Sequence, residues 1–143
     1  MSDKDNINVV RKLFEAYNKN DSHKLSAFDA IMAANVRFND PALSNHAVGL
    51  KEMKQGESSL LIAFPTKKIS VDYIFATQDK VVVRWSSTGV QQGSYQGIAP
   101  THKQVTVSGM SIYTLANGKI VEVWQLWDRL ALMEQLNPLS KAA

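Results

Sequence analysis

The sequence predicts an α+β domain in which an antiparallel sheet packs against helices on one of its faces. Apolar residues recur at helical spacing through residues 9–64 and then at a period of two through residues 69–127. Helices that precede a run of strands are typical of α+β domains, whereas βαβ folds alternate the two. The 143 residues, 45% of them hydrophobic, suit one domain over residues 1–143 with its own core.

The first half of the chain contains three predicted helices and one short strand. Residues 9–17 place apolar side chains on one helix face, and residues 25–32 form a shorter helical pattern. Residues 36–38 alternate as a brief strand. A third helix begins after Gly49 and ends before Pro65, because the residue that precedes a proline disfavours the helical conformation.

The second half predicts a meander of strands. The four predicted strands cover residues 69–75, 81–85, 105–115 and 120–127. Asn117-Gly118 predicts a tight hairpin between the last two strands, because both residues tolerate the positive φ of a type I′ turn. A final helical segment at 130–136 follows Asp128.

The last predicted strand is apolar on both faces. Val121, Val123 and Trp127 share one face, and Ile120, Trp124 and Leu126 share the other. An antiparallel sheet usually exposes one face to water, so a strand that is apolar on both indicates a covered outer face. We therefore expect a homodimer, or a higher homo-oligomer, formed through the sheet.

Composition excludes several classes of function. The chain has no cysteine, which rules out disulfides, thiolate zinc sites and cysteine nucleophiles and favours a reducing cytoplasm. The net charge of +3 is too small to predict nucleic-acid binding. No apolar run reaches the roughly 20 residues of a membrane span, and residues 1–6 are too polar for a signal peptide. No histidine pair has the spacing of a metal site, and no glycine-rich phosphate loop is present, so we expect no metal and no cofactor.

A twisted sheet wrapped around helices forms a cone with a pocket, which is the expected place for a small hydrophobic ligand. Period two places Asp128 on the same face of the last strand as Trp124 and Leu126. A carboxylate among apolar side chains would be partly desolvated, which suits a proton carrier. Asp128 also directly precedes a helix, where aspartate is a favoured N-cap, and the pattern alone favours the cap.

Several stretches together resemble a known family. They are Gly-Ser-Tyr-Gln-Gly-Ile-Ala-Pro-Thr at 93–101, Asn-Gly-Lys-Ile-Val-Glu-Val-Trp at 117–124, Asp128 and Gln135-Leu136, with Phe-Asn-Asp-Pro at 38–41 and Phe64-Pro65 in the first half. The pattern resembles the SnoaL-like polyketide cyclases of the nuclear transport factor two superfamily. The resemblance implies a cystatin-like fold, a curved antiparallel sheet wrapped around N-terminal helices.

In those cyclases a pocket aspartate acts as general acid and base in the intramolecular aldol closure of a polyketide ester, without metal or cofactor. The resemblance implies this role for Asp128, and Asn39 matches a polar pocket residue. Gln91 and Leu126 stand where the family often has histidine. An amide forms hydrogen bonds but does not relay a proton as imidazole does, so the cyclase relay is incomplete.

The sequence thus predicts a cofactor-independent acid/base enzyme of cyclase or isomerase type that acts on a hydrophobic carbonyl or polyketide-like compound. Asp128 is its expected base, and Gln91 or Asn39 would hold the developing oxyanion. The expected pocket lining is Trp85, Met110, Trp124 and Leu126. Two alternatives stay open: a small-molecule binding domain that has lost the relay, and a structural dimerisation domain.

Overall fold

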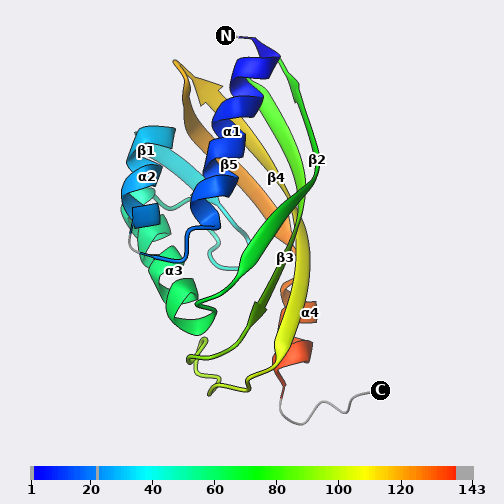
Figure 1. Ribbon diagram of the computed structural model, residues 1–143. Coiled ribbons are helices and arrows are strands. Elements are labelled where there is room, and N and C mark those ends of the chain that lie inside the picture. The colour runs from blue at the N-terminus through cyan, green and yellow to red at the C-terminus, as the bar shows by residue number, and fades with distance from the viewer. Residues whose placement is uncertain (1, 22, 138–143) are drawn as a thin grey trace.

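A computed structural model of the chain describes residues 2–21 and 23–137 and confirms the predicted α+β fold (Figure 1). The helices are α1 (Asp3–Tyr17), α2 (His23–Ile31), α3 (Leu50–Ala63) and α4 (Arg129–Leu136). The strands are β1 (Met32–Asn39), β2 (Lys68–Thr77), β3 (Lys80–Val90), β4 (Gln104–Ala116) and β5 (Lys119–Trp127). Within the described ranges, no helix is long and apolar enough to span a bilayer.

The sheet is curved and unclosed, with strand order β1-β5-β4-β3-β2. Neighbouring strands are antiparallel except β1, which runs parallel to β5. The sequence predicted only residues 36–38 of β1 and a second helix reaching 32. Strand β1 is longer because its backbone pairs with β5 from Met32 to Asn39, a contact that no local pattern in residues 32–35 indicates.

Figure 1 shows α1 along the concave face of the sheet, with α2 and α3 beside it. The apolar face of α1 is fully buried at Val10 and Leu13, as the helical spacing predicted. Phe14 and Tyr17 continue this face, and their rings meet edge to face with centroids 5.8 Å apart. The main core therefore lies between the helices and the concave face.

Strand register decides which side chains face the helices. Three register rows point inward, namely Val81–Tyr113–Val123, Val83–Ser111–Gln125 and Trp85–Gly109–Trp127. Two rows point outward, namely Phe75–Val82–Ile112–Trp124 and Tyr73–Arg84–Met110–Leu126. Ile120 is also buried, although it lies three residues before Val123, because the pairing of β4 with β5 shifts register between Thr114 and Leu115.

Candidate active site

A cavity of about 690 Å³ lies between the concave face of the sheet and helices α1 and α3. Its size is typical of a small-molecule site. Most of its lining is aromatic or aliphatic, including Phe14, Phe64, Trp85 and Leu132. The charged and hydroxyl side chains in this lining are the groups able to orient a ligand.

Asp40 is a buried carboxylate in the wall of this cavity. It directly follows β1, and only 4% of its surface is exposed. The backbone N–H of Ala42 donates to Asp40 Oδ1 at 3.1 Å, in the short turn that Pro41 begins. The end of β1 and this turn together hold the carboxylate against the last strand.

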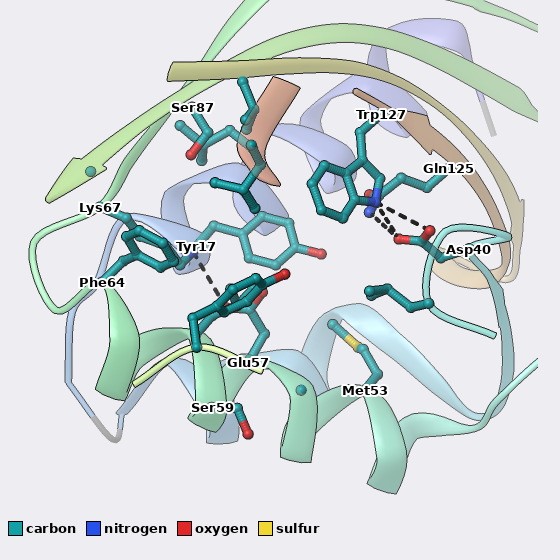
Figure 2. Close-up of a pocket in the computed structure, with 18 of the residues that line it drawn as sticks. Tyr17, Asp40, Met53, Glu57, Ser59, Phe64, Lys67, Ser87, Gln125 and Trp127 are labelled. Atoms are coloured by element: carbon teal, nitrogen blue, oxygen red, sulfur yellow. Dashed lines mark hydrogen bonds and ion pairs between the residues drawn. The ribbon is translucent and has the colours of Figure 1, made fainter. Parts of the chain in front are cut away.

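Two side chains from the inward face of β5 donate hydrogen bonds to Asp40. Trp127 Nε1 lies 2.9 Å from Oδ2 and 3.2 Å from Oδ1, and Gln125 Nε2 lies 3.0 Å from Oδ2. Figure 2 shows both contacts as dashed lines at one side of the cavity. The carboxylate is thus held by donors 85 and 87 residues away in the sequence.

The environment of Asp40 changes its acidity. Burial raises the pKa of this carboxyl above the ordinary value of 3.8, while the hydrogen bonds from Gln125, Trp127 and two backbone amides oppose the shift. Burial has the larger effect on this pKa. It raises the pKa because a buried site disfavours the charged form of the carboxyl group. A carboxyl with a raised pKa is a stronger base when ionised, which suits proton transfer from a carbon acid.

A buried chain of hydrogen bonds orients the Gln125 amide. Trp85 Nε1 donates to Ser111 Oγ at 3.0 Å, and Ser111 Oγ donates to Gln125 Oε1 at 3.3 Å. Gln125 Oε1 therefore faces Ser111, which leaves Nε2 to donate to Asp40. Such a satisfied buried network favours a single arrangement of the site.

Gly109 makes room for the two indoles that support this network. It lies between Trp85 and Trp127 in one register row. A Cβ atom on Gly109 would lie 2.5 Å from Trp85 Cζ2, 2.7 Å from the Leu126 carbonyl oxygen and 2.8 Å from Trp127 Cβ. Any other residue here would displace an indole or the backbone of β5.

Three tyrosines also line the cavity: Tyr17, Tyr95 and Tyr113. Burial raises the pKa of all three hydroxyl groups. They therefore stay protonated at neutral pH and act as hydrogen-bond donors. Figure 2 shows Tyr17 extending from α1 into the middle of the cavity. A phenol there can donate to a ligand oxygen that gains negative charge.

A cluster of charges lies where α2 and α3 approach the start of β2. Lys24 Nζ and Lys67 Nζ lie 3.4 Å and 3.5 Å from the same atom, Glu57 Oε2. Lys24 is fully buried, and 11% of the Lys67 side chain is exposed. Glu57 and Lys67 line the cavity, whereas Lys24 lies behind them.

The predicted catalytic residue, Asp128, lies elsewhere. It is exposed and is not among the residues that line the cavity. Its Oδ1 accepts a hydrogen bond of 2.9 Å from the Ala131 N–H, which makes it the N-cap of α4. The capping interpretation therefore describes its position, and the expectation that it faces the pocket is wrong.

Three of the predicted lining residues face outward, away from the cavity. Met110, Trp124 and Leu126 are 52%, 50% and 67% exposed and lie on the convex face of the sheet. The sequence interpretation chose the wrong face of β5, where Gln125 and Trp127 are the residues that point inward. Met110 lies opposite Leu126 on β4 and therefore shares its outward face. Among the four predicted lining residues, only Trp85 is in the cavity wall.

Gln91 is fully buried but supports a loop instead of facing the cavity. Its Nε2 donates to the carbonyl oxygens of Gly93 and Ile98 at 3.1 and 3.0 Å. Its Oε1 accepts from Thr101 N at 3.1 Å and from Thr101 Oγ1 at 2.7 Å. These four hydrogen bonds tie together both ends of the segment between β3 and β4, so Gln91 has no group free for an oxyanion.

Asn39 lies beside the site but not in the cavity wall. Its Nδ2 donates to the Val123 carbonyl oxygen at 3.0 Å, which fixes the end of β1 against β5. It therefore positions its neighbour, Asp40. Sequence reasoning missed Asp40 as a site residue, although an aspartate between a strand and Pro41 is itself a signal for a turn at a strand end.

Comparisons with known proteins agree with this architecture. The sequence model of the SnoaL-like polyketide cyclases matches residues 8–136. A proposed SnoaL-like polyketide cyclase from Jannaschia sp. CCS1 is similar in structure, with 26% identity, a TM-score of 0.86 and coverage of 95% of this chain and 94% of that chain. IdmH, a proposed polyketide cyclase from Streptomyces antibioticus, gives 21% identity, a TM-score of 0.80 and coverage of 92% and 97%. A search of curated proteins gave no match.

Proposed function

Since this chain belongs to the SnoaL-like polyketide cyclase family, we propose that it is a cofactor-independent acid/base enzyme acting on a hydrophobic carbonyl compound, with Asp40 as the proton carrier. The observation that carries the proposal is the buried Asp40 carboxylate in the wall of an apolar cavity, held by two side-chain donors. The proposal also includes two expectations from the sequence, namely that residues 1–143 form one domain and that the protein is cytoplasmic.

The reaction begins with removal of a proton from the carbon next to a carbonyl group. Ionised Asp40 takes this proton, and the electron pair of the C–H bond moves to the carbonyl oxygen as an enolate. A protonated tyrosine hydroxyl such as that of Tyr17 donates a hydrogen bond to this oxygen. The enolate carbon then attacks a second carbonyl of the same molecule, and Asp40 returns its proton to the new alkoxide.

The absence of histidine at two family positions is the argument for the alternative, a binding domain without catalysis. In this chain Gln91 is buried in a loop and Leu126 is on the convex face. Neither residue lines the cavity, so neither substitution removes a group from it. The alternative therefore loses its specific support, and the acid/base function is the one that we retain.

Proton exchange tests the proposal without knowledge of the natural substrate. A panel of hydrophobic ketones, β-keto esters and aromatic keto acids is incubated with the protein in D₂O, and deuterium uptake at the α-carbon is followed by NMR. We expect catalysed exchange with the wild type and a loss of about 10²- to 10⁴-fold in Asp40→Asn, the usual contribution of a general base. Asp128→Asn is the matched control, because it changes an exposed aspartate outside the cavity. Full activity in Asp40→Asn would show that the base is another group.

The proposed functional unit is a homodimer formed through the convex face of the sheet. The two outward rows present six exposed large hydrophobic side chains: Tyr73, Phe75, Met110, Ile112, Trp124 and Leu126. This face also carries charges of both signs, among them Arg37, Arg84, Asp72 and Glu122, so a second copy related by a twofold axis can pair opposite charges. Light scattering should give twice the mass of the chain, and Trp124→Glu should give the monomer mass. A monomeric wild type at micromolar concentration contradicts the dimer.

A further inference from the structure

Lys67 is the one cationic side chain among the described residues that line the cavity. It follows the turn after α3, where its backbone N–H donates to the Phe64 carbonyl oxygen at 3.2 Å. Its stem packs beside Gly89, where an added Cβ would come within 3.2 Å of Lys67 Cβ. The side chain is 11% exposed and its ammonium group pairs with Glu57, so it lies in the cavity wall instead of extending into water as most lysines do.

Lys67 shares its carboxylate partner with a second lysine. One carboxylate oxygen of Glu57 faces two ammonium groups, those of Lys24 and Lys67. Lys24, which is not among the residues that line the cavity, directs a second hydrogen bond of 3.3 Å to the Tyr17 carbonyl oxygen. Burial, followed by the nearby charge of Lys67, lowers the pKa of Lys24. With both lysines protonated, the cluster has one excess positive charge in a poorly solvated position.

Lys67 also has donor capacity to spare. An ammonium group has three N–H donors. Among the described residues, the acceptor that the structure places beside it is the Glu57 oxygen at 3.5 Å. Its other close neighbours are the Lys24 ammonium group, which supplies no acceptor, and the Tyr17 ring, with the centroid 5.5 Å away. A ligand anion would supply the strong acceptor that this geometry lacks.

The cluster is separated from the proposed base. Figure 2 shows the Lys67–Glu57 pair at one side of the cavity and Asp40 with Gln125 and Trp127 at the other, with Tyr17 extending between them. A ligand anion bound at Lys67 would therefore lie away from the Asp40 carboxylate, and the two negative charges would not share one site.

We propose that Lys67 binds a carboxylate group on a hydrophobic ligand, so that the substrate is an aromatic or polyketide-like acid and not a neutral compound. This inference deepens the proposed function and rests on it for the orientation of the reacting carbon toward Asp40. The anion fixes one end of the molecule at Lys67, and the body of the molecule crosses the cavity past Tyr17. The carbon acid is then the distal part of the ligand.

Binding of a matched pair of probes tests the inference without turnover. Isothermal titration calorimetry at pH 8 compares 2-naphthoate with 2-naphthamide, which has nearly the same shape but no charge. We expect the wild type to bind the carboxylate about 10- to 100-fold more tightly, the usual effect of a charge-assisted hydrogen bond. Lys67→Met should remove this preference and Lys67→Arg should retain it. Lys68→Met, which changes an exposed neighbouring lysine, should leave the preference unchanged.

Two further measurements keep the test decisive. Lys67→Met leaves Glu57 paired with Lys24, and a melting curve checks that it folds. Glu57→Gln should strengthen the preference for naphthoate, because it increases the positive charge. Equal or weaker binding of naphthoate by the wild type, a preference that persists in Lys67→Met, or no binding of either probe overturns the inference. If the wild type prefers naphthoate as expected but catalyses no proton exchange, the acid/base function is overturned and the assignment of Lys67 stands.

Discussion

Gly109→Ala tests whether the site depends on the close packing of two indoles. The new methyl carbon would lie 2.5 Å from Trp85 Cζ2 and 2.8 Å from Trp127 Cβ, about 1 Å closer than ordinary carbon contacts. It would also lie 2.7 Å from the Leu126 carbonyl oxygen, which belongs to the paired backbone of β5. Because side chains and backbone must all shift, we expect the full overpacking cost of about 1–3 kcal/mol.

The assay is thermal and urea unfolding followed by tryptophan fluorescence. A loss of 1–3 kcal/mol corresponds to a melting temperature lower by roughly 3–12 °C for a domain of this size. Gly56→Ala is the matched control, because a Cβ there meets no atom within 4 Å and Gly56 lies within α3. That variant should gain up to about 1 kcal/mol, since alanine favours a helix over glycine. Equal stability of Gly109→Ala and the wild type would refute the packing argument.

Three other variants test the remaining assignments. The pKa of Asp40 is raised by burial, so the native protein takes up a proton at a pH where the unfolded chain is still ionised. The free energy of unfolding of the wild type, relative to Asp40→Asn, should therefore fall as the pH increases from about 4 through this raised pKa, as measured by urea titrations over a pH series. A flat difference contradicts the raised pKa. Asp128→Ala should cost about 0.5–2 kcal/mol of stability through loss of the cap and leave naphthoate binding unchanged; weakened binding would return Asp128 to the site. Gln91→Ala should cost about 2–4 kcal/mol, because it leaves buried partners such as Thr101 without their hydrogen bonds, and an unchanged urea midpoint would contradict this role.

Local periodicity predicted most of the elements, because each buries one face at its own period. The helix at 9–17 and the hairpin at Asn117-Gly118 are confirmed as part of α1 and as the β4–β5 turn. The parallel pairing of β1 with β5 was not predictable in this way. It joins residues about 85 positions apart, and neither segment shows in its own sequence which strand it will meet.

The site was harder to predict than the fold, and β5 shows why. Its two faces are nearly equally apolar, so composition gave no sign of which one faces the helices. The register shift between Thr114 and Leu115 turns Val123, Gln125 and Trp127 inward and leaves Trp124 exposed. A wrong choice of face misplaced Trp124 and Leu126 together, since strand side chains alternate.

The parallel pairing of β1 with β5 also has a consequence for folding. Asp40 and its donor Trp127 are 87 residues apart, so the site exists only after one of the longest chain closures in the molecule. An intermediate that has formed only the β2–β5 meander lacks the Asp40 carboxylate and therefore lacks the candidate site. We expect recovery of ligand binding during refolding to follow the slowest long-range step, so that function reports the completed sheet and not its earlier, more local parts.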